Sequence, residues 1–295
     1  MRSPANLICL SLVGLVALAA ILAPLITPHD PAFISVADRL QPPSLDGEYL
    51  LGSDHLGRDV ASRLLFGARV SMGVGAAVVA LSCSLGVILG LLGGYLGRAG
   101  DLLMRIVDGM LAFPEIVLAL ALIAALGSSL LNVILALTFV FVPRVARVVH
   151  ASVLSLRNRE FVLSAEALGC SPIRVVIWHI LPQALGLVAV QATFIFAHAV
   201  ISEAGLTFLG VGLPPGGASW GAMLSEGRAH LLDAPWITTL PGLAIFSLVL
   251  SLNILGDGLR DMLDPRLVVL PPGRYGRRLR GGQNGDARAS SASSR

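Results

Sequence analysis

Residues 70–96 read VSMGVGAAVVALSCSLGVILGLLGGYL and contain no charged side chain. About 20 apolar residues are enough for an α-helix to cross the hydrocarbon core of a bilayer. The glycines in and just after this stretch are Gly73, Gly75, Gly86, Gly90, Gly93, Gly94 and Gly97. Small residues at such spacings let helix backbones approach closely. In lipid, helices associate through this close packing, because the hydrophobic effect does not drive them together. The stretch therefore predicts a membrane-spanning helix with a close-packing face, which could also serve a partner chain.

Five further apolar runs predict five more spans, near residues 7–26, 110–126, 130–142, 185–201 and 237–255. The first run follows Arg2 and resembles a signal peptide, but it is longer than a typical signal core and no small-residue cleavage site follows cleanly. We expect it to remain as the first span. Pro114 should kink the third span, and a tight hairpin at 127–129 should join the third to the fourth. The predicted fold class is an all-α membrane bundle of six helices.

The composition agrees with this fold class, because only 13% of residues are charged, 55% are hydrophobic and the mean hydropathy is +0.81. An average soluble domain has about 25% charged residues. All 21 basic residues are arginine, and a phosphate-binding loop of the G-x-x-x-x-G-K-[ST] type requires lysine. We therefore expect no Walker-type ATPase site in this chain. No other motif predicts a catalytic site or a bound cofactor. Cys9, Cys83 and Cys170 lie far apart and predict neither a metal site nor a disulfide framework.

The distribution of arginine predicts the orientation of the chain, because short cytoplasmic loops of membrane proteins are enriched in basic residues. Residues 144–183 have a net charge of +3 and residues 256–295 a net charge of +4, whereas 27–69 and 202–235 each have −2. Both termini and the 144–183 loop are therefore predicted to be cytoplasmic. The chain divides into a first span with an extracytoplasmic segment (1–69), a core of five spans (70–266) and a disordered basic cytoplasmic tail (267–295).

The 144–183 loop is too long and too apolar for a plain connector. Asn158 is expected to cap a short helix over 160–168, and Gly169 to end it in the left-handed conformation. A second short helix should follow Ser171 and end at Pro182. The apolar side chains of this helix pair need a surface. The pattern leaves two alternatives open: docking into a groove of the bundle or of a partner, or lying on the lipid interface.

The same loop resembles a known family. Glu160-Phe-Val-Leu-Ser-Ala-Glu-Ala-Leu-Gly169 and His179-Ile-Leu-Pro182 are similar to the cytoplasmic loop of binding-protein-dependent ABC permeases, although Leu163 stands where that family usually has Glu. The resemblance implies that the loop couples the permease to an ATPase subunit. The candidate coupling residues are Leu163, Ser164, Ala165, Glu166, Ala167, Leu168, Gly169, Cys170, Ser171 and Pro182.

Further segments resemble the dipeptide, oligopeptide and nickel permeases, specifically their "C"-type subunit: 51–60, 62–65, 67–69, 202–210, 219–224, 234–236, 241–244 and 253–266. The resemblance implies a six-helix type I ABC importer subunit in the bacterial inner membrane that imports peptides, with nickel or metal chelates, opines and glutathione as alternatives. It also implies a second permease, two ATP-binding subunits that hold ATP and Mg, and an extracytoplasmic binding protein, with no nucleic acid. Candidate contacts to the binding protein are Glu203, Trp220 and Trp236; the tryptophans could instead anchor at the bilayer interface.

Two other classes of function are less consistent with the sequence. An autonomous secondary transporter should have ionisable coupling groups at mid-membrane or paired broken helices, and the predicted spans are almost free of charge, with Glu115 and Glu203 near span ends. A membrane hydrolase could use His198 and Ser202, which share a helix face, but the chain has no G-x-S-x-G elbow.

Overall fold

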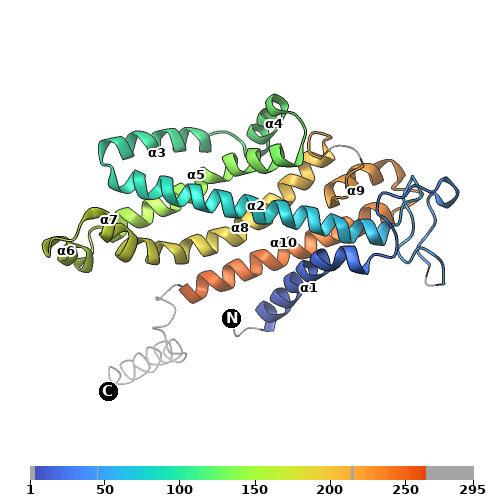
Figure 1. Ribbon diagram of the computed structural model, residues 1–295, viewed down its shortest axis with the longest axis horizontal. Coiled ribbons are helices and arrows are strands. Elements are labelled where there is room, and N and C mark those ends of the chain that lie inside the picture. The colour runs from blue at the N-terminus through green and yellow to red at the C-terminus, as the bar shows by residue number, and fades with distance from the viewer. Residues whose placement is uncertain (1–3, 45, 214–215, 264–295) are drawn as a thin grey trace, which may run out of the picture.

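The computed structural model describes residues 4–44, 46–213 and 216–263, and its long helices lie side by side along the longest axis (Figure 1). These helices are α1 (Pro4–Ile26), α2 (Val60–Tyr95), α5 (Leu130–Leu156), α8 (Leu181–Phe208) and α10 (Trp236–Leu263). Each contains a window long and apolar enough to cross a membrane. The predicted first, second, fourth, fifth and sixth spans are therefore confirmed as helices. The predicted tail at 267–295 lies outside the described residues.

The predicted third span differs from the structure. Two helices, α3 (Arg98–Leu111) and α4 (Glu115–Leu126), meet at a bend of 93°, so the chain has six spans only if this pair counts as one. Residues 97–108, which lie between the predicted second and third spans, are mostly helical because they are amphipathic and bury Gly100, Met104 and Val107. Pro114 disfavours the helical conformation of the residue before it, which explains why α3 ends and a new helix begins rather than a mild kink.

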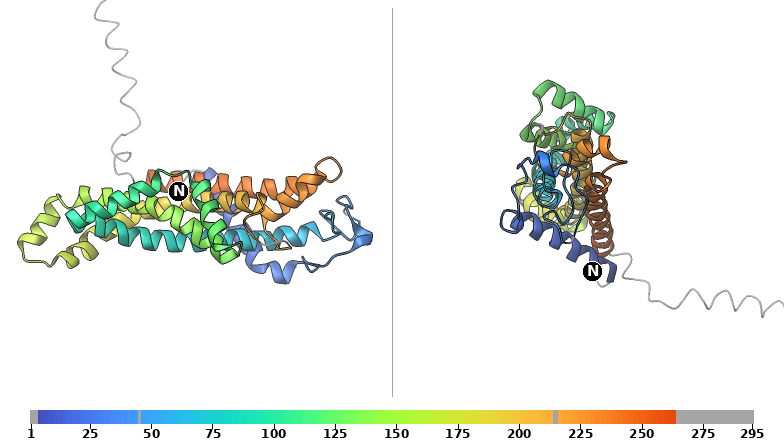
Figure 2. Two further views of the ribbon diagram at one scale, coloured as in Figure 1. Left: turned by 90° about the horizontal axis from the view of Figure 1, so that it is seen from above. Right: turned by 90° about the vertical axis from the view of Figure 1, so that its right-hand side faces the viewer.

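The two ends of the molecule are built differently. At one end, α6 (Glu160–Ala167) and α7 (Pro172–Val175) form a protruding pair, which we call the helix-pair end. At the other, the cap end, α9 (Trp220–Gly227) packs near the 27–59 segment (Figures 1 and 2). Along the sides, α1 lies on one edge of the molecule and α3 and α4 on the opposite edge (Figure 2).

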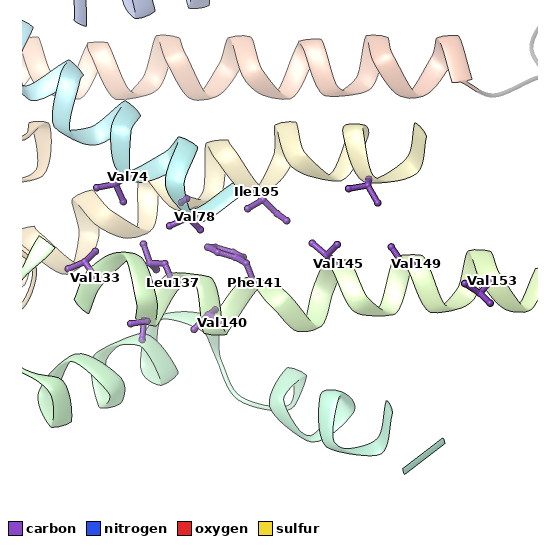
Figure 3. Close-up of a cluster of buried hydrophobic side chains, with 14 of the residues drawn as sticks. Val74, Val78, Val133, Leu137, Val140, Phe141, Val145, Val149, Val153 and Ile195 are labelled. Carbon is purple, nitrogen blue, oxygen red and sulfur yellow. The ribbon is translucent and has the colours of Figure 1, made fainter. Parts of the chain in front are cut away.

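The core lies between α2, α5 and α8 (Figure 3). A Cβ atom added to Gly86, Gly90 or Gly94 would lie 2.4–2.6 Å from side-chain atoms of α5. The facing residues are Val145, Val149 and Val153. Both sets are four residues apart, so one ridge of each helix fits the other. The predicted close packing is confirmed for these three glycines, whereas nothing lies within 4 Å of a Cβ added to Gly73, so the face for a partner chain stays a prediction.

Candidate coupling surface and polar groups at membrane depth

Backbone groups, and no side chain, cap the two ends of the first short helix of the pair. Arg159, not Asn158 as predicted, is the N-cap of α6, and its side chain makes no capping hydrogen bond. Gly169 has φ of +82°, as predicted for the residue that ends the helix. The N–H of Cys170 donates to the carbonyl of Ala165 at 3.1 Å, and that of Gly169 to Glu166 at 2.9 Å. This pattern satisfies the last carbonyls of α6 and fixes the turn into α7.

Pro182 does not end the second short helix, contrary to the prediction. The chain passes from α7 through a π-helical turn, Val176–Ile180, directly into α8. In that turn the N–H of Leu181 donates to the carbonyl of Val176, five residues earlier. The wider turn changes the hydrogen-bond register just before Pro182, whose missing N–H then interrupts no regular helical turn. The helix pair is therefore continuous with a long membrane helix.

The helix pair has one buried and one exposed apolar face. Val162, Ala165 and Val175 are buried against the bundle. Leu168 is 86% exposed and Trp178 is 73% exposed. Thus the bundle covers one face only, and the other remains available to a partner or to lipid.

The predicted coupling residues lie together at this end, and most are exposed. Those exposed are Leu163, Ser164, Glu166, Ala167, Leu168, Gly169, Ser171 and Pro182, whereas Cys170 is half-buried and Ala165 is buried. The hydroxyl of Tyr95 donates to Glu166 at 3.4 Å, so α6 is tied to the end of α2. A cleft of about 250 Å³ lies beside this contact and also involves Arg157 and Leu163.

The cap end contains a buried ion-pair network that the sequence reasoning did not single out. Arg58 Nε bonds to Asp54 Oδ2 at 2.6 Å, and Arg63 Nη1 bonds to the same oxygen at 2.7 Å. Both guanidinium groups also reach Glu226, at 2.6 and 2.9 Å. Burial alone would raise the pKa of Asp54, but backbone hydrogen bonds from Arg58 and the charges of Arg63 and Arg58 outweigh it and lower the pKa.

Part of this network also has the residue types of a metal site. Atoms of Asp54, His55 and Glu226 that could bind a metal lie within 4.8 Å of one another. Both carboxylates are already neutralised by arginines, however. The arrangement is accounted for by structural ion pairs that join the segment before α2 to α9.

The three residues predicted to contact a binding protein all make hydrogen bonds within the chain, and Trp236 is half-buried. Trp220 is buried, and its indole N–H donates to the carbonyl of Leu64 at 3.0 Å. The indole of Trp236 donates to the carbonyl of Ser53 at 3.1 Å. Glu203 is fully buried and accepts a hydrogen bond from Ser71 at 2.9 Å. Trp220 and Glu203 therefore present no surface to a binding protein in this structure, and neither indole N–H is free to anchor at the bilayer interface.

Charged side chains also occur in the middle of the bundle, where the sequence predicted almost none. Arg144 bonds to Glu115, and Arg147 bonds to Asp108 at 2.7 Å. Both arginines lie within α5, because that helix continues past Val142, where the predicted span ended. Charge at these two positions predicts a loop, so the sequence does not reveal the ion pairs.

The histidine and serine considered for a hydrolase lie in different environments. His198 is exposed and packs near Phe141, with ring centroids 6.5 Å apart. Ser202 is buried. Among the described residues no hydrogen bond joins the two, so the arrangement does not favour a nucleophile and base.

The chain is similar to known transport proteins over most of its length. The family model described as binding-protein-dependent transport system inner membrane component matches residues 85–269, and the model for the N-terminal membrane domain of oligopeptide transport permease C matches residues 1–43. A putative peptide transport system permease of Brucella suis is 48% identical over 91% of this chain and 90% of its own. A dipeptide transport system permease of Alkalihalophilus pseudofirmus is 44% identical over 88% and 86%.

The fold is similar to that of a chain of the inward-facing MetNI methionine ABC transporter, with a TM-score of 0.56 at 19% identity over 68% of this chain and 96% of that one. This likeness agrees with the arrangement of membrane helices. The family model and the relatives, rather than this likeness, assign the chain to a family. This chain therefore belongs to the binding-protein-dependent transport system inner membrane components and is a permease subunit of an ABC importer.

Proposed function

We propose that this permease carries peptides and that its helix-pair end docks onto an ATP-binding subunit. The observation that carries the solute assignment is the 48% identity, over 91% of the chain, with a relative described as a peptide transport system permease. Relatives described as dipeptide and di/tripeptide permeases are 41–44% identical. A small peptide is accordingly the favoured solute.

The docking proposal is supported by the exposed apolar face of the helix pair. Leu168 and Ile173 stand on either side of the Gly169 turn, and Ile173 is 69% exposed. An exposed apolar helix face is typical of helix-in-groove recognition. The segment that follows α5, residues 157–180, has three arginines and two glutamates, a net charge of +1, and basic residues are enriched on the cytoplasmic side, where an ATP-binding subunit would be.

The proposed complex contains a second permease, two ATP-binding subunits that hold ATP and Mg, and a solute-binding protein at the cap end. In this arrangement both termini are cytoplasmic and the chain lies in the bacterial inner membrane. The solute path would run between the two permeases. ATP hydrolysis would take place in the ATP-binding subunits and reach this chain through α6 and α7.

The solute assignment is tested by uptake in cells that lack their own peptide importers and express the complete transporter. We expect uptake of a labelled dipeptide that unlabelled di- and tripeptides inhibit. A second candidate is glutathione, because a relative described as a glutathione transport system permease of Escherichia coli is 42% identical over 86% of this chain. Inhibition by glutathione, nickel chelates or opines, with none by peptides, would contradict the peptide assignment.

A further inference from the structure

One ion pair lies deep within the part of the bundle that crosses the bilayer. Val145 packs on Gly86, where an added Cβ would lie 2.5 Å from the valine Cβ. Gly86 is ten residues before Leu96, the end of the uncharged stretch, which corresponds to about 15 Å at 1.5 Å per residue. The neighbouring Arg144 is therefore near the middle of a hydrocarbon core about 30 Å thick.

This ion pair is open to the outside of the chain. The side chain of Arg144 is 34% exposed and that of Glu115 is 36% exposed. Ionisable groups at this depth are costly toward lipid and face the interior of an assembly or a water-filled cavity. The non-helical break at 112–114 precedes Glu115, and irregular backbone at membrane depth is likewise tolerated only inside protein or beside water.

Further polar side chains continue the same face. Arg144 lies over the ring of Phe141, 5.8 Å from its centroid, and exposed His198 lies near the same ring. Gln191 and Arg260 line a neighbouring cleft of about 440 Å³ together with Val148 and Phe194. Val148 is four residues after Arg144 and Phe194 four before His198, so each pair shares a helix face. We call Glu115, Arg144, His198, Gln191 and Arg260 the polar strip.

Other exposed faces of the spans differ from the polar strip. On α1, the exposed side chains at comparable depth are Leu15, Leu18 and Ile21. On α10 they are Leu243, Phe246 and Leu250. These surfaces have the composition expected of helix faces in contact with lipid. Among the described residues at this depth, the outer faces of α1 and α10 are thus apolar, whereas the face with Arg144 and Glu115 is polar.

We infer that the polar strip is this chain's wall of a water-filled solute path, which a second permease closes on the other side. Water at this face removes the cost of exposing Arg144, Glu115 and His198 at mid-membrane. A wall whose central charges are paired presents little net field, which suits a hydrated solute that has both charges, such as a peptide. The solute class rests on the proposed function, whereas the presence of water does not.

The inference is tested by the reactivity of single cysteines in membranes that contain the complete transporter. Starting from a variant without Cys9, Cys83 and Cys170, His198→Cys places a thiol on the strip and Phe246→Cys places one on α10. Phe246 is the matched control, because it is 64% exposed and lies ten residues from the nearest end of its helix. We expect a charged, lipid-insoluble thiol reagent to modify the thiol at 198 about tenfold faster or more, since the reactive thiolate forms only in water.

Equally slow modification at both positions would overturn the inference, because a dry interface or a lipid face would protect both thiols. A second readout needs no cysteine removal. His198→Asp should leave the abundance of the assembled transporter near that of the wild type, whereas Phe246→Asp should reduce it, because a charge facing lipid opposes insertion. Equal losses would also overturn it. Neither readout depends on the solute, so failure of the peptide assignment would appear only in the uptake assay.

Discussion

Asp54 shows how a single residue organises the cap end. One of its carboxylate oxygens bonds to two buried guanidinium groups, while the other accepts the N–H groups of Leu56 and Arg58. Gly57 has φ of +76°, and a Cβ there would lie 1.8 Å from the carbonyl oxygen of Ser35. The contacts of segment 51–60, which resembles other permeases, therefore give it a structural role: it forms part of the cap that precedes α2.

Asp54→Asn should destabilise the protein by about 3 kcal/mol or more, because it leaves buried arginine charge without its main partner. Thermal unfolding of the purified transporter measures this loss. Asp46→Asn is the matched control, since Asp46 is an exposed residue of the same segment, and it should change stability by no more than about 0.5 kcal/mol. Equal effects of the two variants would contradict the role given to Asp54.

Acid should weaken the same network. Because the pKa of Asp54 in the folded protein is below its ordinary value of 3.8, its contribution to stability is complete above that value. It is lost as the pH falls through the lower, folded pKa. The wild type should therefore lose stability in this acidic range more steeply than Asp54→Asn, which already lacks the charge. Parallel pH profiles of unfolding temperature for the two proteins would refute this.

At the scale of whole elements, apolar composition predicted where the spans lie but not how far they extend. Charged residues are rare in helices that face lipid, so they usually mark the loops between spans. Arg144 and Arg147 therefore predict that the fourth span ends at Val142. They are instead accommodated inside α5 by Glu115 and Asp108, on elements distant in sequence. Likewise, proline normally breaks a helix, but Pro182 follows a π-helical turn and lies at the first positions of α8, so the helix continues. Such compensation depends on tertiary contacts and hydrogen-bond register, which one sequence does not reveal.

Gly90→Ala should weaken the contact between α2 and α5, because the added Cβ would lie 2.6 Å from the backbone oxygen of Ala146. Backbone cannot rotate away as a side chain can, so we expect a loss of about 1–3 kcal/mol. Gly73→Ala is the control on the same helix, since nothing lies within 4 Å of its added Cβ, and alanine's better helix propensity should leave stability equal or higher. Unfolding in detergent measures both, and the reverse order would show that the packing is misassigned.

Gly169→Val should disturb the helix pair, because a β-branched residue at φ of +82° is strained by about 1–2 kcal/mol. We expect reduced assembly with the ATP-binding subunits or reduced solute-stimulated ATP hydrolysis in proteoliposomes. Gly169→Asn should retain both, since asparagine tolerates this conformation. If Gly169→Val keeps assembly and coupling intact, the docking proposal is wrong.

For the whole molecule, the membrane class, most of the spans and the permease family could be predicted from the sequence, and the family match agrees with them. The assignment of surfaces could not. Trp220 and Glu203 are predicted to contact a binding protein, which requires an exposed surface, but both side chains are buried. The polar strip combines residues of α4, α5, α8 and α10, so its existence depends on how the helices pack rather than on any one pattern.

The orientation of the chain remains a prediction from its arginines. Fusions of a reporter enzyme that is active only outside the cytoplasm should be active when joined after Ser44 and inactive when joined after Asn158. The first site follows α1 and the second follows α5. Activity at Asn158, or none at Ser44, would reverse the assignment of the helix-pair end to the cytoplasm.

The absence of a break at Pro182 has a mechanical consequence. Residues 172–208 form one rod of 37 residues, about 55 Å long at 1.5 Å per residue. If a subunit at the helix-pair end tilts this rod by about 5° about its α7 end, the far end swings by about 5 Å. That far end holds Glu203 and Thr207, which are hydrogen-bonded to each other at 3.1 Å. A displacement of α7 would thus reach the cap end as a rigid-body movement of one continuous helix, with no loop in between.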